Sequence, residues 1–254
     1  MRVLLLLLLL LLLTLPARGE EIVADLSQDS VPITATFSGS AIFVFGAVKR
    51  SAPAPADRGA LEAIVTVTGP SEATVVRRKS RTLGIWVNRD AVEVDRAPSF
   101  YAVASTAPLE RILSHTENLR HRINLDHIVQ LIDAPGDIED VQAFREAVIR
   151  IRQDQGLYAV TPGIVELTDE TLLKARIALP ANLVEGDYRT RVFLLRDREV
   201  IDSFETSIAV RKEGLERFIY TLAHERPLIY GLASIFVALI AGWGASELFR
   251  LLRR

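Results

Sequence analysis

The chain has 254 residues, of which 49% are hydrophobic and 24% charged, and it contains no cysteine. This composition is too apolar for a disordered protein, and the missing cysteines exclude disulfide frameworks, thiolate metal sites and cysteine nucleophiles. Much of the apolar excess lies at the two ends. The residues between them, 20–226, are enough for one large domain or two small ones.

Residues 1–19 have the pattern of a secretory signal peptide. Arg2 gives a short positive start, residues 3–15 are an apolar run, and the small residues Ala17 and Gly19 occupy the −3 and −1 positions of a cleavage site before Glu20. The alternative is an uncleaved signal anchor, although an apolar run of 13 residues is short for the ~20 that span a bilayer. We therefore expect an exported domain that begins at Glu20.

Residues 20–106 predict short β-strands. Runs rich in Val, Ile, Thr and aromatic residues alternate with Gly, Pro, Asp and Ser, which is typical of an Ig-like β-sandwich. Segment 51–59 contains two prolines and is predicted to be a loop. The expected strands are 21–26, 32–37, 41–48, 62–68, 74–79, 84–87, 92–95 and 99–104.

Residues 107–156 change to a helical period and predict an insertion. Segments 109–116 and 125–131 suit short helices, and 137–155 suits a longer one with Asp137 as N-cap and Gly156 after its end. On that longer helix one face is expected to carry the apolar residues Val141, Phe144, Val148 and Ile151.

Strand patterns return within 157–212, at 163–167, 171–179, 188–196 and 200–210. These strands either complete the first sandwich or form a second, smaller one, and the sequence leaves both arrangements open. The predicted fold class is thus mainly β, with β-sandwich strands, a helical insertion and a C-terminal transmembrane helix.

The C-terminal part predicts a juxtamembrane helix over 213–226, a transmembrane helix over 227–249 and a tail over 250–254. Residues 228–245 carry no charge and, as a helix, extend about 27 Å, enough to cross the lipid bilayer. Tyr230 and Trp243 lie near the two ends, and the arginines of the tail indicate a cytoplasmic C-terminus. We expect a single-pass type I protein of the inner (plasma) membrane with most of the chain in the periplasm.

Small residues recur along the predicted span. Ser234, Ala238, Gly242 and Ser246 are four residues apart, so they give a smooth face on which another helix can pack closely. The alternative is a span that is merely rich in alanine and glycine. The first interpretation predicts a transmembrane or periplasmic protein partner.

The densest basic run is the candidate ligand-binding site. On a strand Arg77, Lys79 and Arg81 share one face, where they offer a place for an anion or an acidic segment, and Trp86 supplies an aromatic wall. Two alternatives stay open: an edge strand that uses charge to prevent aggregation, and a tryptophan that belongs to the core.

No chemistry beyond binding is indicated. His115, His121 and His127 are six residues apart, about 120° out of phase on a helix, so no metal site is expected. We find no catalytic or dinucleotide motif and expect neither an enzyme nor a cofactor. Residues 20–226 have an excess of six acidic side chains, which argues against nucleic acid as a partner.

Several local sequences resemble a known family. Among them are Phe45-Gly46, Gly84-Ile-Trp-Val-Asn-Arg89, Gln155-Gly-Leu-Tyr158 and Leu179-Pro-Ala-Asn182. With others they make the chain similar, over nearly all of its mature length, to the "putative transmembrane protein" family of alphaproteobacteria. The resemblance implies a Gram-negative inner membrane and genes that often neighbour sulfite-exporter-type permeases, and it implies no catalytic residues.

Together these features predict a non-enzymatic, single-pass inner-membrane protein. Its periplasmic β-sandwich domain is expected to be an accessory or assembly partner of an inner-membrane transporter, with a sulfite or anion exporter as the suggested class. The alternative is a periplasmic module that binds an anion or another ligand.

Overall fold

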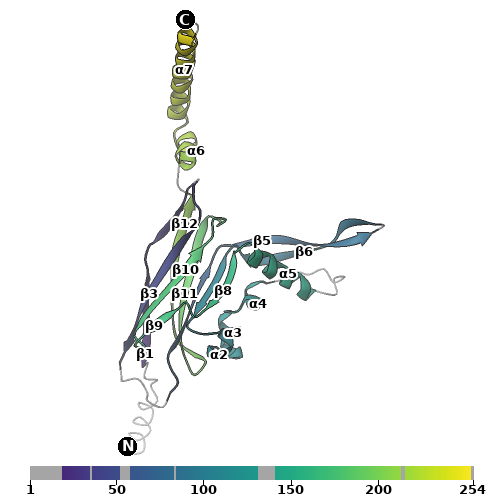
Figure 1. Ribbon diagram of the computed structural model, residues 1–254, viewed down its shortest axis with the longest axis vertical. Coiled ribbons are helices and arrows are strands. Elements are labelled where there is room, and N and C mark those ends of the chain that lie inside the picture. The colour runs from purple at the N-terminus through teal and green to yellow at the C-terminus, as the bar shows by residue number, and fades with distance from the viewer. Residues whose placement is uncertain are drawn as a thin grey trace, which may run out of the picture. The chain divides into compact units, whose positions relative to one another are not determined.

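The computed structural model describes residues 19–34, 36–51, 58–82, 84–130, 141–212 and 215–252, and it is mostly β (Figure 1). Residues 1–18 of the predicted signal peptide and the predicted cap Asp137 lie outside these residues. By its contacts the chain divides into two units, residues 1–31 with 38–210, and residues 32–37 with 211–254.

A four-stranded antiparallel sheet forms one layer of the first unit. Its strand order is β1 (Glu20–Leu26), β3 (Ser40–Arg50), β10 (Leu172–Leu179) and β9 (Glu166–Thr168). Alternate residues such as Ile42 and Val44 are buried, whereas Phe45 on the other face is 43% exposed. One face of this sheet therefore packs into the core and the other faces solvent.

A six-stranded sheet forms the second layer. Its strand order is β2 (Ser30–Ile33), β12 (Glu199–Lys212), β11 (Gly186–Arg196), β4 (Glu62–Thr68), β7 (Tyr101–Ser105) and β8 (Tyr158–Pro162). Consecutive residues of β4 and β7 are buried, so both faces of the central strands are covered. This sheet contains the parallel pair β7 and β8, whose connection is the helical insertion.

The strands that follow the insertion pair with strands that precede it. β10 pairs with β3 and β11 pairs with β4, so early and late strands share both sheets. The β-sandwich expected from the sequence is confirmed, and of the two arrangements left open the chain adopts one sandwich around a helical insertion.

The insertion comprises α2 (Leu109–Ile112), α3 (His115–His121), α4 (Leu125–Ile128) and α5 (Val141–Asp154). Tyr101 of β7 donates a hydrogen bond to the Ile123 carbonyl at 2.7 Å, which ties the insertion to the sheet. On α5 the expected apolar face differs in one position: Phe144 and Val148 are buried, but Ile149 is buried with them while Ile151 is 46% exposed.

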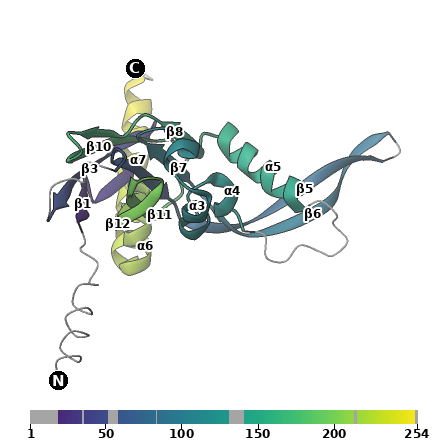
Figure 2. The same cartoon turned by 90° about the horizontal axis from the view of Figure 1, so that it is seen from below.

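β5 (Ser71–Thr82) and β6 (Ile85–Pro98) form a two-stranded hairpin that pairs with neither larger sheet among the described residues. Segments 84–87 and 92–95, expected to be separate strands, are one strand, because a register shift near Lys79 carries the pairing through the polar residues between them. Figures 1 and 2 show the hairpin extending away from the sandwich with α5 alongside it.

The second unit contains α6 (Leu215–Glu225) and α7 (Pro227–Leu252). The two helices join at Arg226, whose N–H donates to the Leu222 carbonyl and whose carbonyl accepts from the Tyr230 N–H, both at 3.1 Å. Residues Pro227–Ala245 have a mean hydropathy of 1.9, and none of this window is buried. The predicted C-terminal apolar helix is confirmed.

Candidate functional site

The predicted ligand-binding residues lie on one face of the β5–β6 hairpin. Arg77, Lys79 and Arg81 alternate along β5 and are all exposed. Arg81 is directly opposite Trp86 of β6, and directly opposed residues in an antiparallel pair share a face. The hairpin therefore brings the indole beside the row of cations, a set that we call the basic face (Arg77, Lys79, Arg81 and Trp86).

Trp86 is 68% exposed, and Ile85 beside it is 64% exposed. The interpretation of Trp86 as a core residue is therefore wrong. Among the described strands none other than β5 and β6 belongs to this two-stranded sheet, and the large side chains at its end are exposed. Tryptophan and arginine are among the residue types that contribute most of the binding free energy at protein interfaces.

The opposite face of the hairpin packs against α5 and the neighbouring insertion. Val92 and Val94 are completely buried, and the Arg78 guanidinium lies 5.3 Å from the centre of the Phe144 ring on α5. Phe144 itself is 3% exposed. The hairpin is thus held by an apolar contact near its base and by a cation–π contact further along.

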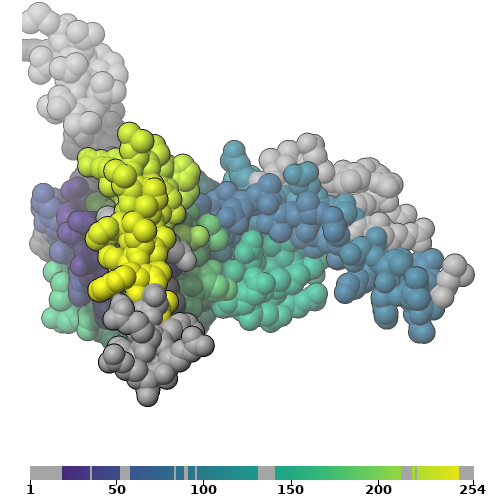
Figure 3. Space-filling model, turned by 90° about the horizontal axis from the view of Figure 1, so that it is seen from above, coloured from purple at the N-terminus to yellow at the C-terminus, as the bar shows by residue number. Residues whose placement is uncertain are grey.

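A groove of about 400 Å³ runs between β5 and α5. β5 contributes Arg77, Arg78 and Lys79, and α5 contributes Arg150, with Glu146 as the acidic group of the lining. Apolar side chains complete the lining, namely Val76, Ala143, Phe144, Ala147 and Ile151. Figure 3 shows the side chains of the hairpin, in blue, directly beside those of α5, in teal green.

Three residues of the groove, Arg78, Arg150 and Ile151, were not among the predicted site residues. Arg78 lies within the same basic run, but strand alternation assigns it to the other face of β5. Arg150 has no signal beyond its place in the predicted helix 137–155, and Ile151 was expected on the apolar face of that helix. The groove depends on how α5 lies against β5, a long-range contact that has no local sequence signal.

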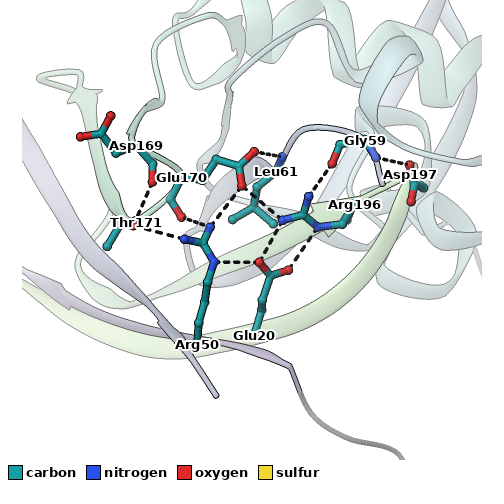
Figure 4. A network of polar contacts seen from close by, with 9 residues as sticks. All are labelled: Glu20, Arg50, Gly59, Leu61, Asp169, Glu170, Thr171, Arg196 and Asp197. Atoms are coloured by element: carbon teal, nitrogen blue, oxygen red, sulfur yellow. Dashed lines mark hydrogen bonds and ion pairs between the residues drawn. The ribbon is translucent and has the colours of Figure 1, made fainter. Parts of the chain in front are cut away.

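A second polar cluster joins the ends of the two sandwich sheets (Figure 4). Arg196, 3% exposed at the end of β11, holds the Glu20 carboxylate with two nitrogens, at 2.9 and 3.2 Å. Arg50 of β3 contacts the same carboxylate at 3.0 Å. Glu170 lies 3.2 Å from Arg50 and 3.4 Å from Arg196, so two cations and two carboxylates balance one another.

This network also orders loops of the domain. Arg196 donates to the Gly59 carbonyl, and a Glu170 oxygen accepts from the Leu61 N–H at 3.2 Å. Burial raises the pKa of Glu20, but hydrogen bonds and charge from Arg196 and Arg50 lower it more, so that the pKa lies below its ordinary value. Because the charges pair among themselves, the cluster acts as a structural clamp.

The three histidines that were weighed as metal ligands are distributed over two helices of the insertion. His115 and His121 stand at the two ends of α3, and His121 Nε2 is 3.3 Å from a Glu117 carboxylate oxygen. His127 belongs to α4. In the part of the chain that the structure describes, no group of three or more His, Asp or Glu side chains is placed to hold a metal ion.

The small-residue face of α7 is exposed at Ser234, Ala238 and Gly242. Ser234 donates its hydroxyl to the Tyr230 carbonyl at 2.9 Å, so its polar group is satisfied within the helix. A Cβ added at Gly242 would meet no atom of the chain within 4 Å. Ser246 lies in α7, but its side chain is outside the described part.

Among the described residues, a β-sandwich is followed by one apolar helix long enough to cross a membrane, with none of Pro227–Ala245 buried, and this combination defines a membrane protein. The chain belongs to the family described as "Putative transmembrane protein (Alph_Pro_TM)", which matches residues 21–251.

No curated protein matches the chain. One similar solved structure is Spo0M, a sporulation control protein from Bacillus subtilis, with 8% sequence identity and a TM-score of 0.30. That comparison covers 82% of this chain and 55% of the Spo0M chain, so it spans about half of that protein. A TM-score this low supports no statement about fold or function.

Proposed function

We propose that this protein is a non-enzymatic, type I inner-membrane protein whose periplasmic β-sandwich domain is an accessory or assembly partner of a transporter in the same membrane. The observation that carries the proposal is α7, whose 19-residue apolar window has no buried residue. The partner class is an anion exporter of the sulfite-exporter type, as the family resemblance suggested.

The surface of α7 supports assembly with another helix. Lipid chains require no smooth face, whereas close helix packing does, and small residues at four-residue intervals provide one. Ala238 and Gly242 lie exposed on this face, and a Cβ added at Gly242 would meet nothing within 4 Å. Bulk added here therefore affects a neighbouring helix more than the fold of the chain.

Purification of the tagged full chain from native membranes, followed by mass spectrometry, tests the proposal. We expect a polytopic membrane protein to co-purify, and the double variant Ala238→Leu, Gly242→Leu to reduce its recovery about tenfold, equivalent to about 1.4 kcal/mol. The matched control is Phe236→Leu, Ile240→Leu, which keeps the bulk of two exposed side chains on the opposite side of α7. Equal recovery with both double variants would exclude helix-mediated assembly.

A ligand-binding role for the domain is the second candidate, and the basic face favours it. All three of its cations are exposed, and Arg77 and Lys79 also line the groove against α5. Sites for small anions enclose the ion with several donors, so an open row of cations suits a longer acidic partner better.

A further inference from the structure

The outer part of the hairpin, residues 76–89, is a positive element on an acidic domain, whereas the whole hairpin, residues 71–98, carries six basic and four acidic side chains. Residues 76–89 carry five basic side chains and no acidic one, whereas the rest of 20–226 carries 20 basic and 31 acidic side chains. Such separation of charge is a feature of a surface that attracts an oppositely charged partner. The cations are concentrated where the hairpin extends from the sandwich (Figure 2).

The spacing of the cations matches an extended chain. Alternate residues of a strand are separated by about 6.7 Å, so Arg77, Lys79 and Arg81 form a row at that interval. An extended peptide that carries Asp or Glu at every second position presents carboxylates at the same interval. One such peptide therefore reaches all three cations with neighbouring acidic residues.

The groove beside the row suits the apolar side chains that alternate with those carboxylates. Ala143 and Ala147 leave room between helix and strand, and Ile151 is 46% exposed at the same groove. At the far end of the row Trp86 offers an exposed indole opposite Arg81. The surface thus combines cations with apolar contacts along one line.

We propose that the basic face and the groove against α5 bind an extended acidic segment of a partner protein, with carboxylates on Arg77, Lys79 and Arg81, where the segment also covers Trp86, and alternate apolar side chains toward Ile151. The inference rests on the proposed accessory function, since the segment would belong to the membrane partner. A flat lipid surface does not enter a groove between a strand and a helix. A nucleic acid would be repelled by the acidic remainder of the domain and by Glu146 at the groove.

The test uses the full chain in detergent micelles with Trp243→Phe, which leaves Trp86 as the single tryptophan. The probe is an octapeptide of alternating Asp and Val, compared with a peptide of the same composition in which the Asp residues precede the Val residues. Binding of the alternating peptide should shift the Trp86 emission to the blue, because the exposed indole becomes covered. We expect it to bind about tenfold more tightly than the block peptide.

Substitutions locate the site. The triple variant Arg77→Gln, Lys79→Gln, Arg81→Gln should weaken binding at least about tenfold. The matched control Lys49→Gln, Lys174→Gln, Arg176→Gln removes three exposed cations from the four-stranded sheet and should leave affinity within about twofold. Circular dichroism of each variant separates loss of binding from loss of folding.

Three results would overturn the inference: no binding of the alternating peptide, equal binding by the triple variant, or tighter binding to phosphatidylglycerol vesicles or a single-stranded oligonucleotide than to the peptide. Each concerns the hairpin alone. Failure of the assembly function would instead appear in the α7 variants, so the two failures are distinguishable.

Discussion

Arg196 and Glu20 are 176 positions apart in the chain, yet the guanidinium of one holds the carboxylate of the other in a two-nitrogen contact. The pair joins β11 of the six-stranded sheet to β1 of the four-stranded sheet. Since Arg196 is 3% exposed and Glu20 is 9% exposed, breaking the pair leaves a charge with little access to water.

Substitution of Arg196 by Met should destabilise the domain strongly. Glu20 loses its main partner while Arg50 holds it from one side only, so we expect about 3 kcal/mol lower free energy of unfolding. Denaturant unfolding of the full chain in detergent, followed by circular dichroism, measures it. The control Arg189→Met removes an exposed ion pair with Glu205 and should cost at most about 1 kcal/mol. Similar losses in both variants would contradict the role of the clamp.

Acid should weaken the same clamp. The folded pKa of Glu20 is lowered below its model-compound value of 4.5, so this carboxylate contributes stability above that pH. The contribution is lost as the pH falls through the folded pKa. In Glu20→Gln the stability should be lower at neutral pH, and the difference from wild type should shrink below pH 4.5. Thermal unfolding at several pH values checks this, and a constant difference would exclude the assignment.

Loss of the Tyr101 hydroxyl should loosen the helical insertion. Tyr101→Phe leaves the Ile123 carbonyl without its 2.7 Å hydrogen bond, and we expect about 1 kcal/mol of destabilisation. Burial raises the pKa of Tyr101 above its ordinary value of 10, so this phenol should ionise only at a pH where the domain unfolds. A spectrophotometric titration that ionises all five tyrosines reversibly, without unfolding, would contradict this burial.

The contact between Arg78 and Phe144 should couple the hairpin to α5. A double-mutant cycle with Arg78→Met and Phe144→Leu is expected to give a coupling energy of about 0.5–1 kcal/mol. Hydrogen exchange of amides 76–80 should also accelerate in each single variant, since the strand loses its contact with the helix. A coupling energy of zero would show that the two side chains only happen to be adjacent.

Local sequence patterns predicted those elements whose burial follows a simple period. Strands such as β3 and β10 alternate, α5 repeats its apolar residues, and α7 carries no charge from Leu228 to Ala245, so these elements were located within a few residues, whereas β8 was not predicted. They did not reveal that β10 joins β3 or that β11 joins β4, because the choice of a strand's partner depends on the whole fold.

Part of the candidate site could likewise be predicted from the sequence, and part of it could not. Strand alternation placed Arg77, Lys79 and Arg81 correctly on one face. Trp86 resembles a core residue in sequence, and its exposure is explained only by its position opposite Arg81 at the end of a hairpin. Arg196 follows an apolar run in its strand, and nothing local indicates Glu20 as its partner. The groove likewise requires α5 to lie beside β5, and the residues of its two walls are more than 60 positions apart in the chain.

The central claim is that α7 packs its small-residue face against a partner helix. Photocrosslinking in intact cells tests it most directly, with a benzophenone amino acid placed at Gly242 on this face or at Phe236 on the opposite face. The account predicts an adduct with a polytopic membrane protein from position 242 and none from position 236. No adduct from either position, or equal adducts from both, would contradict it.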